Sequence, residues 1–237
     1  MKATRLFSPR TALGVAFTLL AATCATLAAN ETHKLVYAPN STAQGKSLQE
    51  WFGVYWRWYY SGADSAQSKV GHVQLMPLPN GEQISGSWTP ADPALLRGSL
   101  EITLSPGTPF VLPEYSWIRE EYTDGSVDPV LDDAVALAAG HPTLTIDGAT
   151  VVSEQNKADF YVAATDFDPA VMYQEPSSYG SVAAISFQGV GIVGKPLAKG
   201  VHTIHLYEPL IIPAGAYSGL PDGIGVIYDN TWTVTVK

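Results

Sequence analysis

The protein has 237 residues, with 22 acidic and 13 basic side chains that give a net charge of −9. This acidic balance argues against nucleic acid and anionic membranes as partners, and it permits cations, neutral glycans or basic proteins. The length suits one core of β-sandwich size and is short for two.

Residues 1–29 have the pattern of a secretory signal peptide. A basic beginning is followed by an apolar stretch that ends in small residues. This order predicts export and removal of the leader after Ala28 or Ala29, and hence a secreted or periplasmic protein without stable membrane insertion. A transmembrane anchor and a lipoprotein signal at Cys24 are the alternatives.

Cys24 is the single cysteine of the sequence, and it lies within the expected leader. The exported chain would therefore have no disulfide and no thiol chemistry, so its own core must stabilise it. Residues 30–46 are polar and predict a flexible lead-in. Residues 47–237 are then expected to form a single domain.

The stretch SLQEWFGVYWRWYY, residues 47–60, predicts a long aromatic helix. Ser47 and Glu50 have the spacing of a capping box, in which each side chain satisfies a free amide at the helix start, and Gly62 is a natural stop. Apolar side chains recur at three- and four-residue steps around most of the circumference, which is typical of a largely buried helix. A helix lying in a membrane surface is the alternative, but its polar face would offer Arg57 alone.

Most of the remaining chain reads as strands. Leu100, Ile102 and Leu104 alternate, as do Trp232, Val234 and Val236 near the end of the chain. In LTIDGATVV the Asp147-Gly148 pair predicts a tight hairpin turn. Further strands are expected in residues 181–197 and 200–212, and TDFDP, which contains Asp166 and Asp168, is expected to be a turn.

A second helix is expected in DPVLDDAVALAAGHP. Asp128 would cap it, Pro129 would occupy its first turn and Gly140 would end it. The complete pattern predicts a mainly β protein: an antiparallel, jelly-roll-like β-sandwich with one long aromatic N-terminal helix and one short helix.

Four stretches together resemble a family of secreted bacterial proteins of unassigned function. They are the Trp-rich EWFGVYWRWYY, the segment GTPFVLPEYSWIREEYTDGS, the strand-turn-strand LTIDGATVV, and an ending in which GVHTIHLYE precedes WTVTVK. The resemblance covers most of the chain after the leader. It implies a secreted, β-rich domain, and it transfers no catalytic residue.

Aromatic side chains are the first candidates for a binding site. Exposed rings in a groove stack on sugars and other flat apolar faces. The ligand-binding candidates outside the helix are Tyr115, Trp117, Tyr173, Tyr179 and Tyr217.

Acidic residues before the second helix are the candidates for a metal site. A flexible loop rich in carboxylates suits calcium, although the spacing does not match an EF-hand. These candidates are Glu120, Glu121, Asp124 and Asp128. Calcium is the one cofactor considered, and acids near a helix start also stabilise the helix dipole without any metal.

The histidines of HTIH form a weaker candidate. On a strand His202 and His205 face opposite sides. One of them could still converge in space with Glu208 and with His72 to form a metal or acid-base site.

The leading hypothesis is a secreted, non-catalytic protein that binds a ligand or partner, with carbohydrate as the ligand class. The first alternative is a carbohydrate-active enzyme that uses a pair of carboxylates from among Glu114, Glu120 and Glu121. The sequence contains no nucleophilic-serine elbow and no glycine-rich phosphate loop. The second alternative is a structural or matrix protein without a small ligand.

Overall fold

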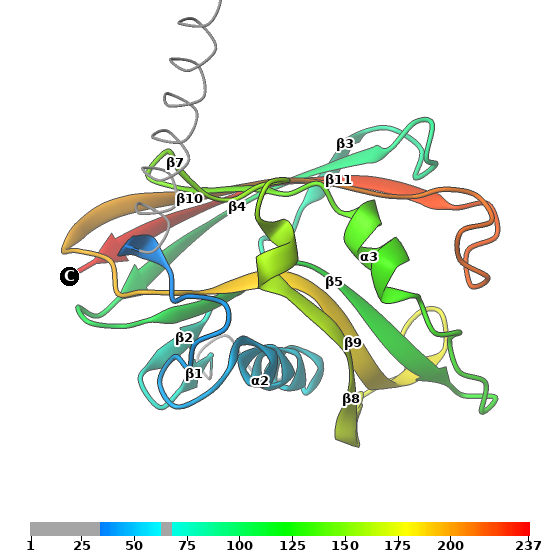
Figure 1. Cartoon of the computed structure of the whole chain (residues 1–237). Coiled ribbons are helices and arrows are strands. Elements are labelled where there is room, and N and C mark those ends of the chain that lie inside the picture. Colours follow the sequence, from blue (N-terminus) through cyan, green and yellow to red (C-terminus); the bar gives the residue numbers. More distant parts are fainter. Residues whose placement is uncertain (1–33, 63–67) are drawn as a thin grey trace, which may run out of the picture.

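The computed structural model describes residues 34–62 and 68–237. Within these ranges, two β-sheets face each other (Figure 1). The first sheet has the order β1 (Lys69–Val70), β2 (Val73–Leu75), β5 (Phe110–Tyr122), β9 (Ser181–Gly194) and β8 (Tyr161–Met172). The second has the order β3 (Glu82–Ser85), β4 (Ala94–Leu104), β11 (Ile224–Val236), β10 (Gly200–Ile212), β6 (Thr143–Ile146) and β7 (Ala149–Val152). The helices are α2 (Leu48–Tyr60), α3 (Asp133–Ala139) and the 3-10 turn η2 (Lys157–Phe160).

This architecture confirms the predicted mainly β sandwich with one long aromatic helix and one short helix. The sheets are mixed, which corrects the expectation of a purely antiparallel sandwich. Strand β2 pairs with β5 and β4 pairs with β11 in parallel, while the other pairs are antiparallel. The expected leader, including Cys24, lies outside the described residues.

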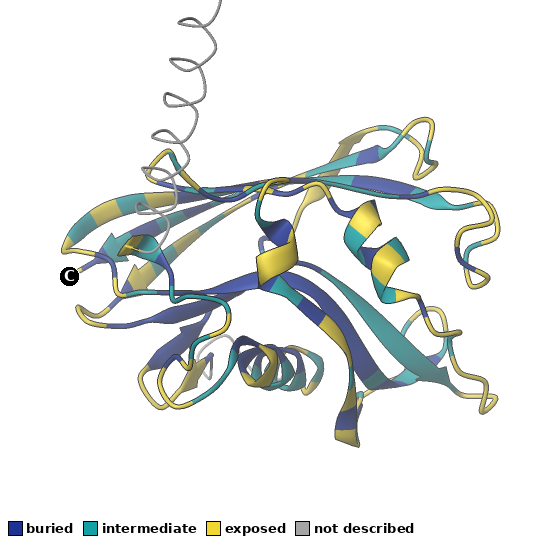
Figure 2. Cartoon of the chain, in the orientation of Figure 1, coloured by how far each residue is buried: buried dark blue, intermediate teal, exposed yellow. Residues whose placement is uncertain are grey.

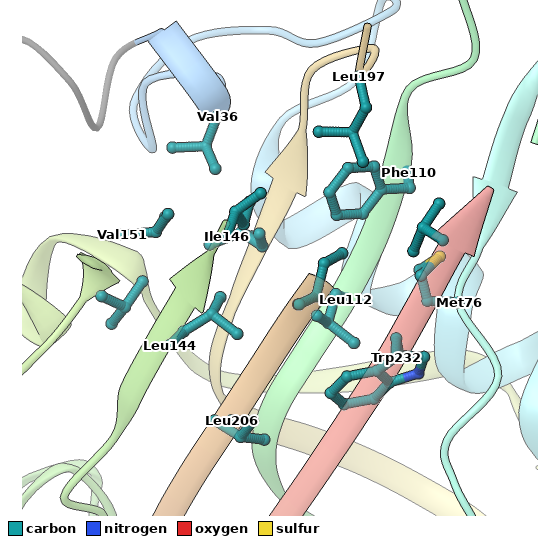
Figure 3. Close-up of a cluster of buried hydrophobic side chains, with 14 of the residues drawn as sticks. Val36, Met76, Phe110, Leu112, Leu144, Ile146, Val151, Leu197, Leu206 and Trp232 are labelled. Carbon is teal, nitrogen blue, oxygen red and sulfur yellow. The ribbon is translucent and has the colours of Figure 1, made fainter. Parts of the chain in front are cut away.

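The main core fills the space between the sheets (Figure 3). Alternate residues of β11 and β10 point inward, so Trp232, Val234 and Leu206 are fully buried or nearly so. From the first sheet, Phe110 and Leu112 of β5 meet them. The indole N–H of Trp232 donates to the Pro77 carbonyl at 2.8 Å, so this buried ring leaves no unpaired donor.

Helix α2 packs on the outer face of the first sheet (Figure 1). Its capping box between Ser47 and Glu50 is present as predicted. Trp51, Phe52, Tyr55 and Trp56 are buried, which confirms that the aromatic helix is mainly a core element. Strand β9 is consequently buried along nearly its whole length, covered by α2 on one face and by the second sheet on the other (Figure 2).

Residues 34–46 are packed, which corrects the expectation of a flexible lead-in for this part of the segment. Val36 is fully buried in the main core, and the Tyr37 amide donates to the Val193 carbonyl at 2.9 Å. The Ala43 carbonyl accepts a hydrogen bond of 2.7 Å from the Trp51 indole N–H. Isolated apolar residues in a polar stretch thus anchor it to the sheet and to α2.

Helix α3 is shorter than expected, and its cap is Asp132 rather than Asp128. The Asp132 carboxylate accepts from the Ala134 and Val135 amides, and Gly140 ends the helix as predicted. Asp128 instead accepts from the Glu120 amide at 3.0 Å and from the Tyr122 hydroxyl at 2.9 Å. Either aspartate could cap the helix, judged by its residue type and its place before the helical pattern. The hydrogen bonds of Asp128 to β5 leave Asp132 as the cap.

The hairpin at Asp147-Gly148 is confirmed, with φ values of 51° and 79° at the two residues. TDFDP, expected as a turn, lies inside β8, because its apolar Phe167 packs against α2 and β9. No helix in residues 34–62 and 68–237 is long and apolar enough to cross a membrane.

Candidate functional site

The candidate site lies along an open edge of β5. Strand β9 pairs with β5 along its whole length, but β2 pairs with just two residues, Phe110 and Val111. At the far end, residues 126–128 bond back to Glu120 and Tyr122. Between these two contacts, residues 112–119 have no strand on this side within the described chain. Pro113, which has no N–H to donate, suits such an edge.

A β-bulge at Glu114 shapes the edge. The pairing of β5 with β9 jumps from Pro113–Gly191 to Tyr115–Val190, so Glu114 is the extra residue. A bulge changes which face a side chain occupies and is common next to functional sites. Here it places a carboxyl group in the interior, where Glu114 is 5% exposed.

A cavity of about 240 Å³ opens beside this edge, and we call it the inner pocket. One wall is β5, the end of α2 forms a second, and β4, β10, β11 and the segment after β2 form the rest. Its lining includes Trp56, Tyr59, Leu78, Pro79, Gly81, Leu96, Pro113, Glu114, Tyr115, Ser116, Leu210, Tyr228 and Asn230. Aromatic rings and a few polar groups therefore converge on a concave surface, as is typical of small-molecule sites.

The inner pocket concentrates buried polar atoms without hydrogen-bond partners. Among the described residues, eight side-chain nitrogen and oxygen atoms are in this state, and five belong to residues that line the pocket. They are Trp56 Nε1, both carboxyl oxygens of Glu114, Ser116 Oγ and Asn230 Oδ1. Because an unpaired buried polar atom is costly, such a cluster indicates a place where water or a ligand supplies the missing partners.

A second carboxyl group, Glu208 of β10, lies behind the pocket. It is fully buried; its Oε1 accepts from the His141 amide at 2.9 Å, and its Oε2 has no partner. Burial, and secondarily the nearby charge of Glu114, raise the pKa of Glu208 from 4.5 to about 9. Burial alone raises the pKa of Glu114 well above its ordinary value. Burial therefore favours the neutral acid form of both groups.

A more open cavity of about 350 Å³, the outer pocket, adjoins the inner one at Ser116. It is lined by Tyr60, Ser116, Trp117, Ile118, Glu120, Tyr122, Asp128, Tyr217, Gly219 and Leu220. The rings of Trp117 and Tyr217 meet edge to face at 5.1 Å. The Tyr217 hydroxyl donates to the Pro129 carbonyl at 3.0 Å, which fixes the loop after β10 over the pocket.

The structure brings some of the predicted binding aromatics together and separates others. Trp117 and Tyr217 line the outer pocket, and Tyr115 lines the inner pocket. Tyr173 lies behind the outer pocket, where its hydroxyl donates to the Glu120 carboxylate and its ring stacks on Tyr60. Tyr179 is 88% exposed and is in neither lining.

The four predicted calcium ligands are divided among different local contacts. Glu120 accepts hydrogen bonds from the hydroxyls of Tyr173 and Ser181. Asp128 accepts a hydrogen bond from the Glu120 amide of β5. Asp124 accepts from Ser126 in a turn, and Glu121 forms a bridge to Val127. Among the described residues, no group of three or more acidic, histidine or cysteine side chains could hold a metal ion.

The two histidines of β10 face opposite sides, as the alternation predicts. His202 contacts Asp147 at 2.7 Å, a hydrogen bond that raises the pKa of the imidazole. His205 contacts Asp229 at 2.8 Å on the outer surface. Neither residue is in the lining of the inner or outer pocket, so the predicted pairing of a histidine with Glu208 does not occur there.

Several residues of the inner pocket were not singled out from the sequence as site residues. Ser116, Tyr228 and Asn230 line it, and they come from strands more than a hundred residues apart. Asn230 is the one with a usable local signal, because an amide within an apolar-alternating strand is unusual on an inward face.

No protein-family model matches this sequence, and no curated protein matches it. Among solved structures, a cysteine protease inhibitor from Entamoeba histolytica is 13% identical, with 60% of this chain and 94% of that chain covered and a TM-score of 0.23. The solution structure of amebosin is 12% identical, with 58% of this chain and 88% of that chain covered and a TM-score of 0.18. These scores are too low for either likeness to inform the fold or the function.

Proposed function

We propose that this is an exported, non-catalytic binding protein that holds a small carbohydrate unit in the inner pocket. Export rests on the leader pattern of residues 1–29 and on the resemblance to secreted bacterial proteins. The observation that carries the binding function is the group of unpartnered polar atoms in an aromatic-lined cavity.

The chemistry of the lining fits a polyhydroxylated ring. Sugar hydroxyls donate to carboxyl and amide oxygens, such as those of Glu114 and Asn230, and they accept from an indole N–H such as that of Trp56. Tyr59 and Tyr228 offer aromatic surface to the apolar face of such a ring. A volume of about 240 Å³ is below the usual range for drug-sized ligands, which favours a single sugar unit.

The alternative of a carbohydrate-active enzyme is favoured by one observation, the proximity of Glu114 and Glu208. Glycoside hydrolysis needs one protonated carboxyl group and one ionised carboxylate. Burial raises the pKa of both groups, and Glu208 is not in the pocket lining. The pocket therefore does not present two carboxyl groups to one ligand, and binding is the better supported function.

The test is calorimetric titration of the purified protein with a panel of neutral and amino monosaccharides and short glycans. Tyr59 is 44% exposed, so Tyr59→Ala should remove pocket surface with little loss of stability. We expect binding to weaken by about 5- to 30-fold, because one lost ring contact is worth on the order of 1–2 kcal/mol.

Tyr179→Ala is the matched control, because Tyr179 lies in neither pocket. It should leave the affinity unchanged. Binding that depends on Trp117 or Tyr217 and not on Tyr59 would move the site to the outer pocket. Release of reducing ends from a glycan that is lost in Glu114→Gln would replace binding by catalysis. No binding by any sugar, with self-association, would favour the structural alternative.

A further inference from the structure

When Glu114 is ionised, the unpartnered polar atoms of the inner pocket include more acceptors than donors. Three of its unpartnered buried atoms are acceptors, namely the two carboxyl oxygens of Glu114 and the Oδ1 of Asn230. An ammonium group has three N–H donors and no acceptor, whereas a hydroxyl has one donor. A single ammonium group therefore carries as many donors as there are unpartnered acceptors.

The charged groups around the pocket also favour a cationic ligand. No lysine, arginine or histidine is in the lining, and Glu114 has no ion-pair partner in the described chain. Trp56, Tyr59 and Tyr228 contribute aromatic rings to the lining, and the face of such a ring attracts cations and not anions. Uronic acids and sulfated or phosphorylated sugars would meet no positive group, while a cation would meet Glu114.

We propose that the pocket recognises a free, protonated amine, so that the sugar unit it binds is an unacetylated amino sugar whose ammonium group pairs with Glu114. This inference rests on the proposed carbohydrate-binding function and names the ligand class of the same site. N-acetylation would remove both the charge and two of the three donors, so the acetylated sugar should bind as weakly as the neutral one.

The proposal requires a proton to be released on binding. In the empty pocket, burial without a partner raises the pKa of the Glu114 carboxyl and favours its protonated form. When an ammonium group arrives, the carboxyl loses its proton to solvent and remains as carboxylate beside the cation. Charge and protons balance: protein–COOH plus R–NH3+ gives the carboxylate–ammonium pair and one H+.

Other titratable groups surround Glu114 and must be distinguished from it. Glu208 on β10 is a second buried acid that interacts with Glu114. Tyr115 on β5 and Tyr228 on β11 are neutral phenols whose pKa values burial raises further. Lys157 of η2 donates to the Gly140 carbonyl and to Glu154. Tyr59 of α2 is a further phenol in the lining.

The experiment compares glucosamine, N-acetylglucosamine and glucose by titration calorimetry near neutral pH, in two buffers with different heats of ionisation. We expect glucosamine to bind at least about tenfold more tightly than the other two, because a charge-assisted hydrogen bond is worth about 1.5–3 kcal/mol. The dependence of the heat on the buffer should correspond to release of about one proton.

Glu114→Gln keeps the shape of the neutral acid and removes its proton. It should bring the three sugars to similar affinities and abolish proton release. Glu101→Gln, on an exposed position of β4, is the matched control and should behave as the unmodified protein. Retained glucosamine preference or retained proton release in Glu114→Gln would overturn the proposal.

The two proposals can fail separately. If all three sugars bind equally to the unmodified protein, the amine inference is wrong and carbohydrate binding stands. If no sugar binds but methylammonium does so with proton release that Glu114→Gln removes, the amine inference stands and the carbohydrate function is wrong. If neither sugars nor methylammonium bind, both are wrong.

Discussion

Replacing Glu208 by glutamine should make the protein more stable at neutral and alkaline pH. Glu208 is fully buried, and its pKa is raised from 4.5 to about 9 by burial and by Glu114. The folded state therefore holds a proton that the unfolded chain releases at a lower pH. The contribution of Glu208 to the free energy of unfolding is at its full value below about pH 4.5. It is lost progressively as the pH rises toward about 9.

The size of the effect follows from the linkage between proton binding and folding. Each pH unit between the two pKa values costs about 1.4 kcal/mol per proton, so at about pH 7.5 the loss reaches as much as about 4 kcal/mol. Glutamine has no proton to lose, and its amide oxygen can still accept from the His141 amide as Glu208 does now. Glu208→Gln should match the unmodified protein at about pH 4.5 and exceed it increasingly above.

The assay is urea unfolding at a series of pH values, from which the free energy of unfolding is obtained at each. Glu114 contributes a slope of the same sign in both proteins, because burial also raises its pKa. Glu208→Gln should thus reduce the slope without removing it. Glu101→Gln is the control for an exposed carboxyl group. Parallel stability curves for Glu208→Gln and the unmodified protein would refute the assignment of Glu208 as a buried neutral acid.

Three further substitutions test the fold by the same urea measurement. Ser47→Ala removes the cap of α2 and should lower the free energy of unfolding by about 1 kcal/mol; no change would mean that the cap is replaceable. Trp51→Ala empties a site that is 2% exposed and should cost about 3–5 kcal/mol, whereas a cost below that of Tyr59→Ala would contradict the burial of the helix. Gly140→Ala would place a Cβ 2.3 Å from the Tyr115 ring and should cost about 1–3 kcal/mol; a neutral effect would show that Tyr115 can move aside.

The aromatic helix illustrates what could be predicted from local sequence. Its cap, its end and its buried face all depend on residues within a few positions of each other, so Ser47, Glu50 and the recurring rings identified it correctly. The hairpin at Asp147-Gly148 was predictable for the same reason, because the required positive φ angles are a property of those two residues.

Asp128 shows where local rules become ambiguous. Asp128 and Asp132 each precede an apolar helical pattern, and either could cap it. The Glu120 amide and the Tyr122 hydroxyl, both on β5, engage Asp128, which leaves Asp132 as the cap. A contact between separate elements thus decided a feature that the helix sequence alone left open.

The inner pocket belongs almost entirely to the tertiary structure. The sequence determined an acidic chain, a mainly β sandwich and a buried aromatic helix, because charge, alternation and helical periodicity act along the chain. It placed Glu114 near aromatic residues but could not indicate that a bulge and an incomplete strand edge would bury it. Asn230 and Tyr228 reach Glu114 through the packing of two sheets, and pairings of such long range are set by the whole core rather than by neighbours in sequence.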